Sequence, residues 1–145
     1  MDKRHLFPLL LAVAAVTPGP ALAASATPVT LTAELGGAAQ VTKQGDLDGM
    51  GKATLKFAPD AREICYTLLV GNLQDVTAAH LHRGAAGEDG PPVVHFAAPV
   101  TGMSEDCVAV TPEVSSEILS NPAGFYVNVH TKGHPAGAVR GQLTR

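Results

Sequence analysis

The residues best suited to chemistry in this sequence are its histidines. His80 and His82 are two residues apart in a segment with the period of two typical of a strand, so both imidazoles should lie on one face. In a second such segment Tyr126, Asn128 and His130 share a face in the same way. If the two strands are neighbours, three imidazoles converge, and neutral imidazole is a good ligand for copper and zinc. His80, His82 and His130 are therefore candidate metal ligands.

Two further histidines extend this hypothesis. His95 and His134 lie in or beside expected loops, and either is a candidate for a fourth ligand position. The alternative is that the His80 and His82 rings hydrogen-bond to loop backbone and hold no metal, as such pairs in β domains often do. Copper and zinc are the cofactors that the pattern suggests, and the sequence by itself requires neither.

Other kinds of site find little support. Nucleophilic catalysis needs an activated serine, cysteine or threonine beside a base, and the sequence has no Gly-x-Ser-x-Gly turn. The Gly-rich segment 84–90 is not followed by the Lys-Ser/Thr of a phosphate-binding loop. Residues 46–51 begin like a calcium loop, but Phe57 stands where the twelfth-position glutamate should be. We assign no catalytic residue and expect a protein without enzymatic activity.

The first residues indicate export. Lys3 and Arg4 precede an apolar run at residues 6–16, and residues 21–23 (Ala-Leu-Ala) have the small-x-small form that signal peptidases cleave. The run is too short to span a bilayer comfortably, so no stable membrane span should remain after cleavage. We expect a signal peptide at residues 1–23, a flexible mature N-terminus at residues 24–28 and one domain at residues 29–145.

Charge and compartment follow from that cleavage. The mature chain keeps 8 Lys plus Arg and 12 Asp plus Glu, a net charge of −4. A mildly acidic domain without a basic run is not suited to nucleic acid, so we expect no nucleic-acid partner. The expected location is extracytoplasmic, in a periplasm or in the medium.

The two cysteines fit an oxidising compartment. Cys65 and Cys107 both lie in the mature part and lack the Cys-x-x-Cys spacing of a redox motif. Outside the cytoplasm such a pair most often forms one structural disulfide, which we expect here. The alternative is two buried free thiols.

Apolar residues recur with a period of two along the mature chain, which predicts strands separated by Gly- and Pro-containing turns. About eight are expected, at residues 29–35, 52–57, 63–70, 76–82, 93–96, 107–110, 125–131 and 138–144. One short helix is expected at residues 111–119, with Thr111 as its cap and Pro112 in its first turn. This pattern indicates an all-β sandwich or barrel with the helix in a crossover between strands.

The first and last strands suggest a structural ion pair. Terminal strands of such domains often pair with one another, and cross-strand opposite charges stabilise the pairing. We therefore expect Glu34 of the first strand to bind Arg140 of the last strand.

Four segments carry a resemblance to a known family. They are Ala79-His80-Leu81-His82-x-Gly84, Gly87-x-x-Gly90-Pro91, Tyr126-Val127-Asn128-Val129-His130-Thr131 and Gly137-Ala138-Val139-Arg140-Gly141-Gln142-Leu143. Together with the opening segment 31–37 and the cysteine positions they resemble the CHRD domain, named after chordin and widespread in bacterial exported proteins. Ala138 departs from the glutamate usual in the family. The resemblance covers residues 29–144 and implies an immunoglobulin-like Greek-key β-sandwich, with no settled biochemical role.

Three functions are compatible with these features. Ranked first is an exported, non-catalytic CHRD-type binding or structural module whose partner is a protein or a glycan. Second is a copper- or zinc-binding protein that uses the histidines. Third is an enzyme of unrecognised type, which has only the same histidines to support it.

Overall fold

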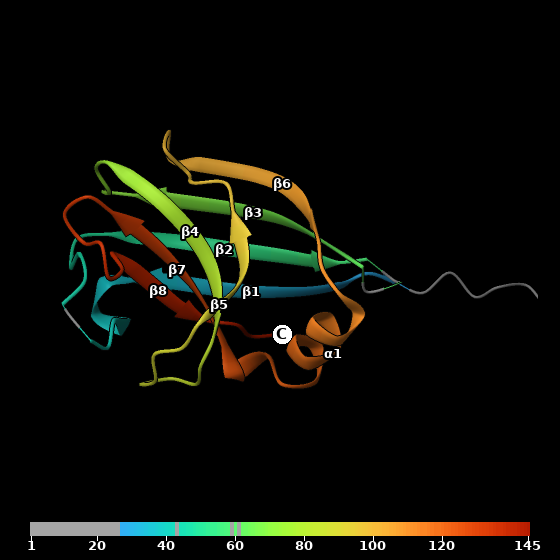
Figure 1. Cartoon of the computed structure of the whole chain (residues 1–145). Coiled ribbons are helices and arrows are strands. Elements are labelled where there is room, and N and C mark those ends of the chain that lie inside the picture. Colours follow the sequence, from blue (N-terminus) through green and yellow to red (C-terminus); the bar gives the residue numbers. More distant parts are fainter. Residues whose placement is uncertain (1–26, 43, 59, 61) are drawn as a thin grey trace, which may run out of the picture.

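The computed structural model describes residues 27–42, 44–58, 60 and 62–145. The expected signal peptide and residues 24–26 of the expected flexible segment lie outside this part of the chain. The strands are β1 (Val29–Gly36), β2 (Met50–Phe57), β3 (Glu63–Gly71), β4 (Val76–Arg83), β5 (Pro92–Phe96), β6 (Met103–Ala109), β7 (Phe125–Thr131) and β8 (Val139–Gln142). One α-helix in the described residues, α1 (Pro112–Ser120), lies between β6 and β7 (Figure 1).

All eight strands belong to one antiparallel sheet, in the order β5-β4-β7-β8-β1-β2-β3-β6. The sheet is joined at its middle, where Gly36 of β1 pairs with Arg140 of β8. It curls nearly into a barrel, so that the half containing β4 and β7 faces the half containing β2 and β3 (Figure 1). The expected all-β fold of eight strands with one crossover helix is confirmed.

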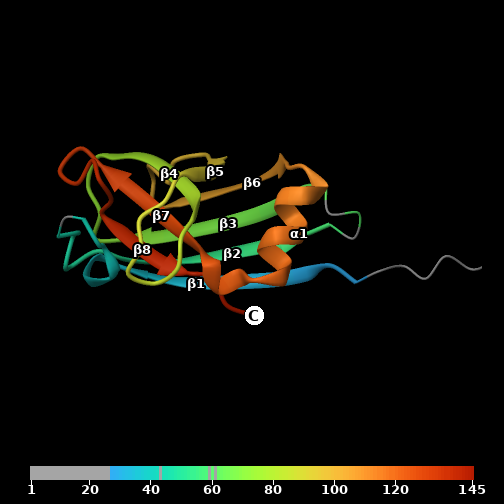
Figure 2. The same cartoon turned by 60° about the horizontal axis from the view of Figure 1, so that its bottom comes forward.

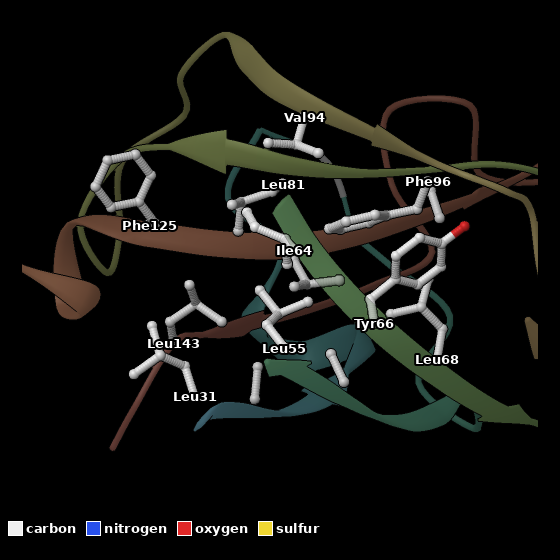
Figure 3. Close-up of a cluster of buried hydrophobic side chains, with 14 of the residues drawn as sticks. Leu31, Leu55, Ile64, Tyr66, Leu68, Leu81, Val94, Phe96, Phe125 and Leu143 are labelled. Carbon is white, nitrogen blue, oxygen red and sulfur yellow. The ribbon is translucent and has the colours of Figure 1, made fainter. Parts of the chain in front are cut away.

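The core lies between these two halves (Figure 3). Because successive strand residues point to opposite faces, alternate apolar residues of each strand enter it. Leu31, Leu55, Leu81 and Val127 are each 0% exposed, although they come from four different strands. The Tyr66 and Phe96 rings pack 4.4 Å apart and join β3 to β5 across the core. The core side of β4 and β7 is thereby filled, which leaves their other side for polar residues.

Helix α1 begins as its sequence predicts. The Thr111 side-chain oxygen accepts a hydrogen bond from the Val114 N–H at 3.4 Å, and Pro112 stands in the first turn. Ile118, which is 0% exposed, carries the helix's apolar face into the core. Figure 2 shows the helix at the end of the molecule where β2 ends and β3 begins.

Two strands, β6 and β8, differ most from the ranges expected from the sequence. β6 begins at Met103 rather than at residue 107, because its polar first half pairs with β3 as far as Leu69. Local alternation cannot reveal this pairing, since Ser104, Glu105 and Asp106 carry no apolar signal. β8 covers residues 139–142 rather than 138–144, although the Leu143 N–H still bonds to the Phe125 carbonyl oxygen of β7 and Thr144 forms an isolated bridge with Thr32 of β1.

A disulfide joins Cys65 and Cys107, as expected. The two residues are direct partners in the β3–β6 pairing. Since β6 pairs with only one strand among the described residues, the disulfide attaches an edge strand covalently to its neighbour.

Candidate functional site

The strands that carry the histidines are neighbours. β4 and β7 pair antiparallel, with His82 opposite Tyr126, His80 opposite Asn128 and Ala78 opposite His130. The core side chains Leu81, Val127 and Val129 occupy one face of this pair, so the histidines share the outer face. The convergence expected from the two-residue spacing is therefore present.

Three imidazoles form one group, which we call the histidine cluster. His80, His82 and His130 each offer a ring nitrogen, and these three nitrogens lie within 4.8 Å of one another. The shortest approach joins His80 Nδ1 to His130 Nε2, at 3.2 Å. His82 is buried, whereas His80 and His130 are partly exposed. The cluster thus lies at the margin between protein and solvent.

Backbone carbonyls orient two of the three rings. His82 Nδ1 lies 2.8 Å from the Gly90 carbonyl oxygen, and His130 Nδ1 lies 3.1 Å from that of Pro135. A carbonyl only accepts, so each Nδ1 must carry the proton, and in the neutral ring each Nε2 holds a lone pair. His82 Nε2 is buried and has no hydrogen-bond partner among the described residues. The cluster therefore contains a buried lone pair without a donor.

Burial favours neutral rings in the cluster. The pKa of His80 is lowered to about 4, mainly by burial and also by the nearby His130, His95 and His82. The pKa values of His82 and His130 are also lowered, mainly by burial, although the carbonyls of Gly90 and Pro135 oppose this. At neutral pH the neutral form of all three imidazoles is favoured, which is the form that binds metals.

The two remaining candidate ligands differ from each other. His95 of β5 pairs with His80 across the strands, and their ring centroids lie 4.7 Å apart, but His95 is exposed and not one of the three clustered residues. His134 lies elsewhere, because its Nδ1 faces the Gln44 carbonyl oxygen at 3.3 Å and its backbone bonds to Thr131. His134 is not one of the three clustered residues, so nothing among the described residues supports it as a fourth ligand.

The expected ion pair between Glu34 and Arg140 is absent from the described structure. Glu34 binds Lys52, its direct partner on β2, at 2.7 Å. Arg140 pairs with Gly36 instead of Glu34, and it lies on the buried outer side of β8, where its guanidinium contacts Asp89 at 3.2 Å. The prediction failed because it depended on a register of β1 and β8 that the pattern of the sequence does not encode.

Several contacts around the cluster were not foreseen from the sequence, although Tyr126 and Asn128 were expected on the same strand face as His130. The Tyr126 ring stacks on the His82 ring at 4.9 Å between centroids. Asn128 accepts a hydrogen bond from Gln40 Nε2 at 2.7 Å. Gly90 and Pro135 contribute only backbone carbonyls. Since every residue has one, residue type does not predict which carbonyl contacts the cluster. The turns Gly90-Pro91 and His134-Pro135 do mark where the chain bends back toward the sheet.

Comparison with known proteins bears on the whole domain. The family model described as the CHRD domain matches residues 31–143. No curated protein and no solved structure matches the chain. Among the described residues no helix is long and apolar enough to cross a membrane. Since the match covers most of the chain, including residues of every strand and the whole histidine cluster, the chain belongs to the CHRD domain family.

Proposed function

We propose that this protein is an extracytoplasmic binding module without catalytic activity, and that its histidine cluster binds a divalent transition metal, copper or zinc. The observation that carries the proposal is the buried His82 Nε2, which holds a lone pair and has no donor among the described residues. A buried polar atom without a partner has a free-energy cost, and a metal bound at that atom removes it.

Membership of the CHRD family supports the general part of the proposal. CHRD domains are extracellular modules for which binding or structural roles are the supported functions. The Cys65–Cys107 disulfide agrees with an oxidising compartment. We propose that residues 1–23 direct export and are removed, with the mature domain acting in a periplasm or in the medium.

The donor set and its spacing support the metal. A metal with bonds of about 2.0–2.1 Å to nitrogen in a tetrahedral site separates neighbouring ligand atoms by about 3.3 Å. The 3.2 Å between His80 Nδ1 and His130 Nε2 is close to this value. Three neutral imidazoles suit copper and zinc, and the exposed His95 beside His80 is a candidate for a fourth ligand after rotation of its ring.

The carbonyls that hold the rings support the same function. Metal-binding histidines commonly donate their other ring N–H to a carbonyl or carboxylate, which fixes the ring and makes its nitrogen a better ligand. The Gly90 and Pro135 carbonyls are placed to do this for His82 and His130. A protein or glycan partner and an enzymatic reaction at the same histidines, the other two functions compatible with the sequence, have no such specific observation in their favour.

Calorimetric titration of the mature domain, residues 24–145 without a His tag, tests the metal. We expect one Zn²⁺ or Cu²⁺ per chain with a dissociation constant below about 1 µM, a free energy beyond about −8 kcal/mol. His82→Ala should weaken binding at least tenfold, because it removes the buried ligand. His134→Ala is the matched control and should bind like the wild type. Wild-type binding weaker than micromolar, or equal binding by His82→Ala, would refute the proposal.

A further inference from the structure

Side chains of β8 hold the Gly-rich loop of residues 84–90, between β4 and β5, against the outer face of the sheet. Figure 2 shows this loop crossing in front of β7 and β8. Two side chains of β8 bind it. Gln142 Nε2 donates to the Gly84 carbonyl oxygen at 3.0 Å, and Arg140 contacts residues 85–89. Both residues belong to the Arg-Gly-Gln-Leu segment that helps to define the family resemblance.

Arg140 makes the larger set of contacts with this loop. Its side chain is 2% exposed, and its guanidinium donates to the carbonyl oxygens of Ala85 and Glu88 at 3.0 and 2.7 Å. It also donates to the Asp89 carboxylate at 3.2 Å. A buried charge is costly unless its donors are satisfied, and here the loop supplies most of the acceptors. Arg140 and the loop therefore depend on each other for their positions.

The same guanidinium is part of a stack that ends at the histidine cluster. It lies 3.4 Å from the centroid of the Tyr126 ring, which is stacked on the His82 ring with 12° between their planes. The Tyr126 hydroxyl accepts a hydrogen bond from the Gly90 N–H at 3.2 Å. Arg140 thus reaches His82 in two ways: through the ring of Tyr126, and through the loop that ends at Gly90.

Gly90 is the residue through which the loop acts on the cluster. Its carbonyl oxygen lies 2.8 Å from His82 Nδ1 and keeps the proton there, so the buried Nε2 is left with a lone pair. A side chain on Gly90 would collide with the Arg83 carbonyl oxygen, so the loop must pass very close to β4 at this point. If the loop moved outward, His82 would lose the acceptor that fixes its tautomer.

We propose that Arg140 is a positioning residue for the histidine cluster: by holding the 84–90 loop against Tyr126, it keeps the Gly90 carbonyl on His82 Nδ1 and presents His82 Nε2 as a ligand. Its effect on metal affinity rests on the proposed function. Its effect on the His82 tautomer does not, because that tautomer exists in the metal-free protein.

Two measurements on Arg140→Lys test the inference. The first is the His82 tautomer, read from ¹⁵N–¹H NMR correlations of the metal-free domain near neutral pH. The second is the zinc affinity, measured by calorimetry. Lys keeps the charge but lacks the planar fork of donors. In the wild type His82 should carry its proton on Nδ1. In Arg140→Lys we expect a mixture of tautomers and zinc affinity reduced about 10- to 100-fold, the usual effect of losing an outer partner of a metal ligand.

Two further variants complete the design. Asp89→Asn removes one charged partner of Arg140 and should change both readouts in the same direction by less; it replaces Arg140→Lys if that variant does not fold. Arg83→Lys is the matched control, because Arg83 binds the Glu117 carboxylate through two hydrogen bonds on the opposite side of β4 and should leave both readouts unchanged.

The outcomes separate the two proposals. A wild type that binds neither zinc nor copper would refute the metal site but leave the tautomer to decide the role of Arg140. Wild-type tautomer and wild-type affinity in both Arg140→Lys, where it folds, and Asp89→Asn would overturn the inference. A mixed His82 tautomer in Arg140→Lys, with Arg83→Lys unchanged, would support it.

Discussion

His80 Nδ1 lies 3.2 Å from His130 Nε2, although the two residues are 50 positions apart in the chain. Because the Pro135 carbonyl keeps the proton of His130 on Nδ1, the His130 Nε2 accepts and His80 Nδ1 donates in the metal-free protein. A metal bound to both nitrogens would occupy that position, and the His80 proton would then lie on Nε2. While this contact is kept the two rings cannot both be protonated, since that would set two donors against each other.

The free energy of unfolding should fall as the pH is lowered from about 7 to 5. The folded pKa of His80 is about 4, below the ordinary value of 6.5, so in this window the unfolded chain binds a proton that the folded chain does not. His82 and His130, whose pKa values are also lowered, act in the same direction. Urea denaturation of the metal-free domain at several pH values measures the slope.

The control for this prediction is His80→Asn, which removes the group with the lowest pKa. Its slope between pH 7 and 5 should be smaller than that of the wild type. Carboxylates such as Glu117, whose pKa is lowered by the hydrogen bond from Arg83, respond only at lower pH and do not affect the comparison. Equal slopes in the two proteins would show that burial of His80 does not shift its titration.

Reduction of the disulfide should destabilise the domain by about 2–4 kcal/mol, because the reduced unfolded chain gains conformational freedom over the residues between the cysteines. The Cys65→Ser/Cys107→Ser double variant should show the same loss in denaturant unfolding. Since the disulfide attaches β6 to β3, amide hydrogen exchange should speed up most along β6. Uniformly faster exchange over all strands would contradict this local role.

Gly141→Ala should destabilise the domain, since a Cβ at this position would collide with the Glu34 carbonyl oxygen. Backbone must move to relieve that contact, so we expect a loss of about 1–3 kcal/mol, as for other overpacked sites. Gly36→Ala is the control: its Cβ meets nothing within 4 Å, and its φ of −152° suits any residue. Similar melting temperatures for the two variants would argue against close approach of β1 and β8.

Local rules account for the parts of the fold that the sequence predicted well. The period of two placed His80 and His82 on one face, and the Thr111-Pro112 pair marked the start of α1. Both depend on residues that are close in the chain. Where the signal was non-local, as for the polar first half of β6 or the partner of Glu34, the prediction was incomplete or wrong.

The candidate site divides in the same way. Residue type and spacing alone place two imidazoles on one strand face and a third on the face of another strand. The tertiary structure decided the rest. It makes the two strands neighbours and places the Gly90 and Pro135 carbonyls beside the rings. It also turns His134 toward the Gln44 carbonyl and packs Arg140 against the loop. Strand order and register depend on how the whole core packs, and a backbone carbonyl is the same in every residue, so neither leaves a mark in the local pattern.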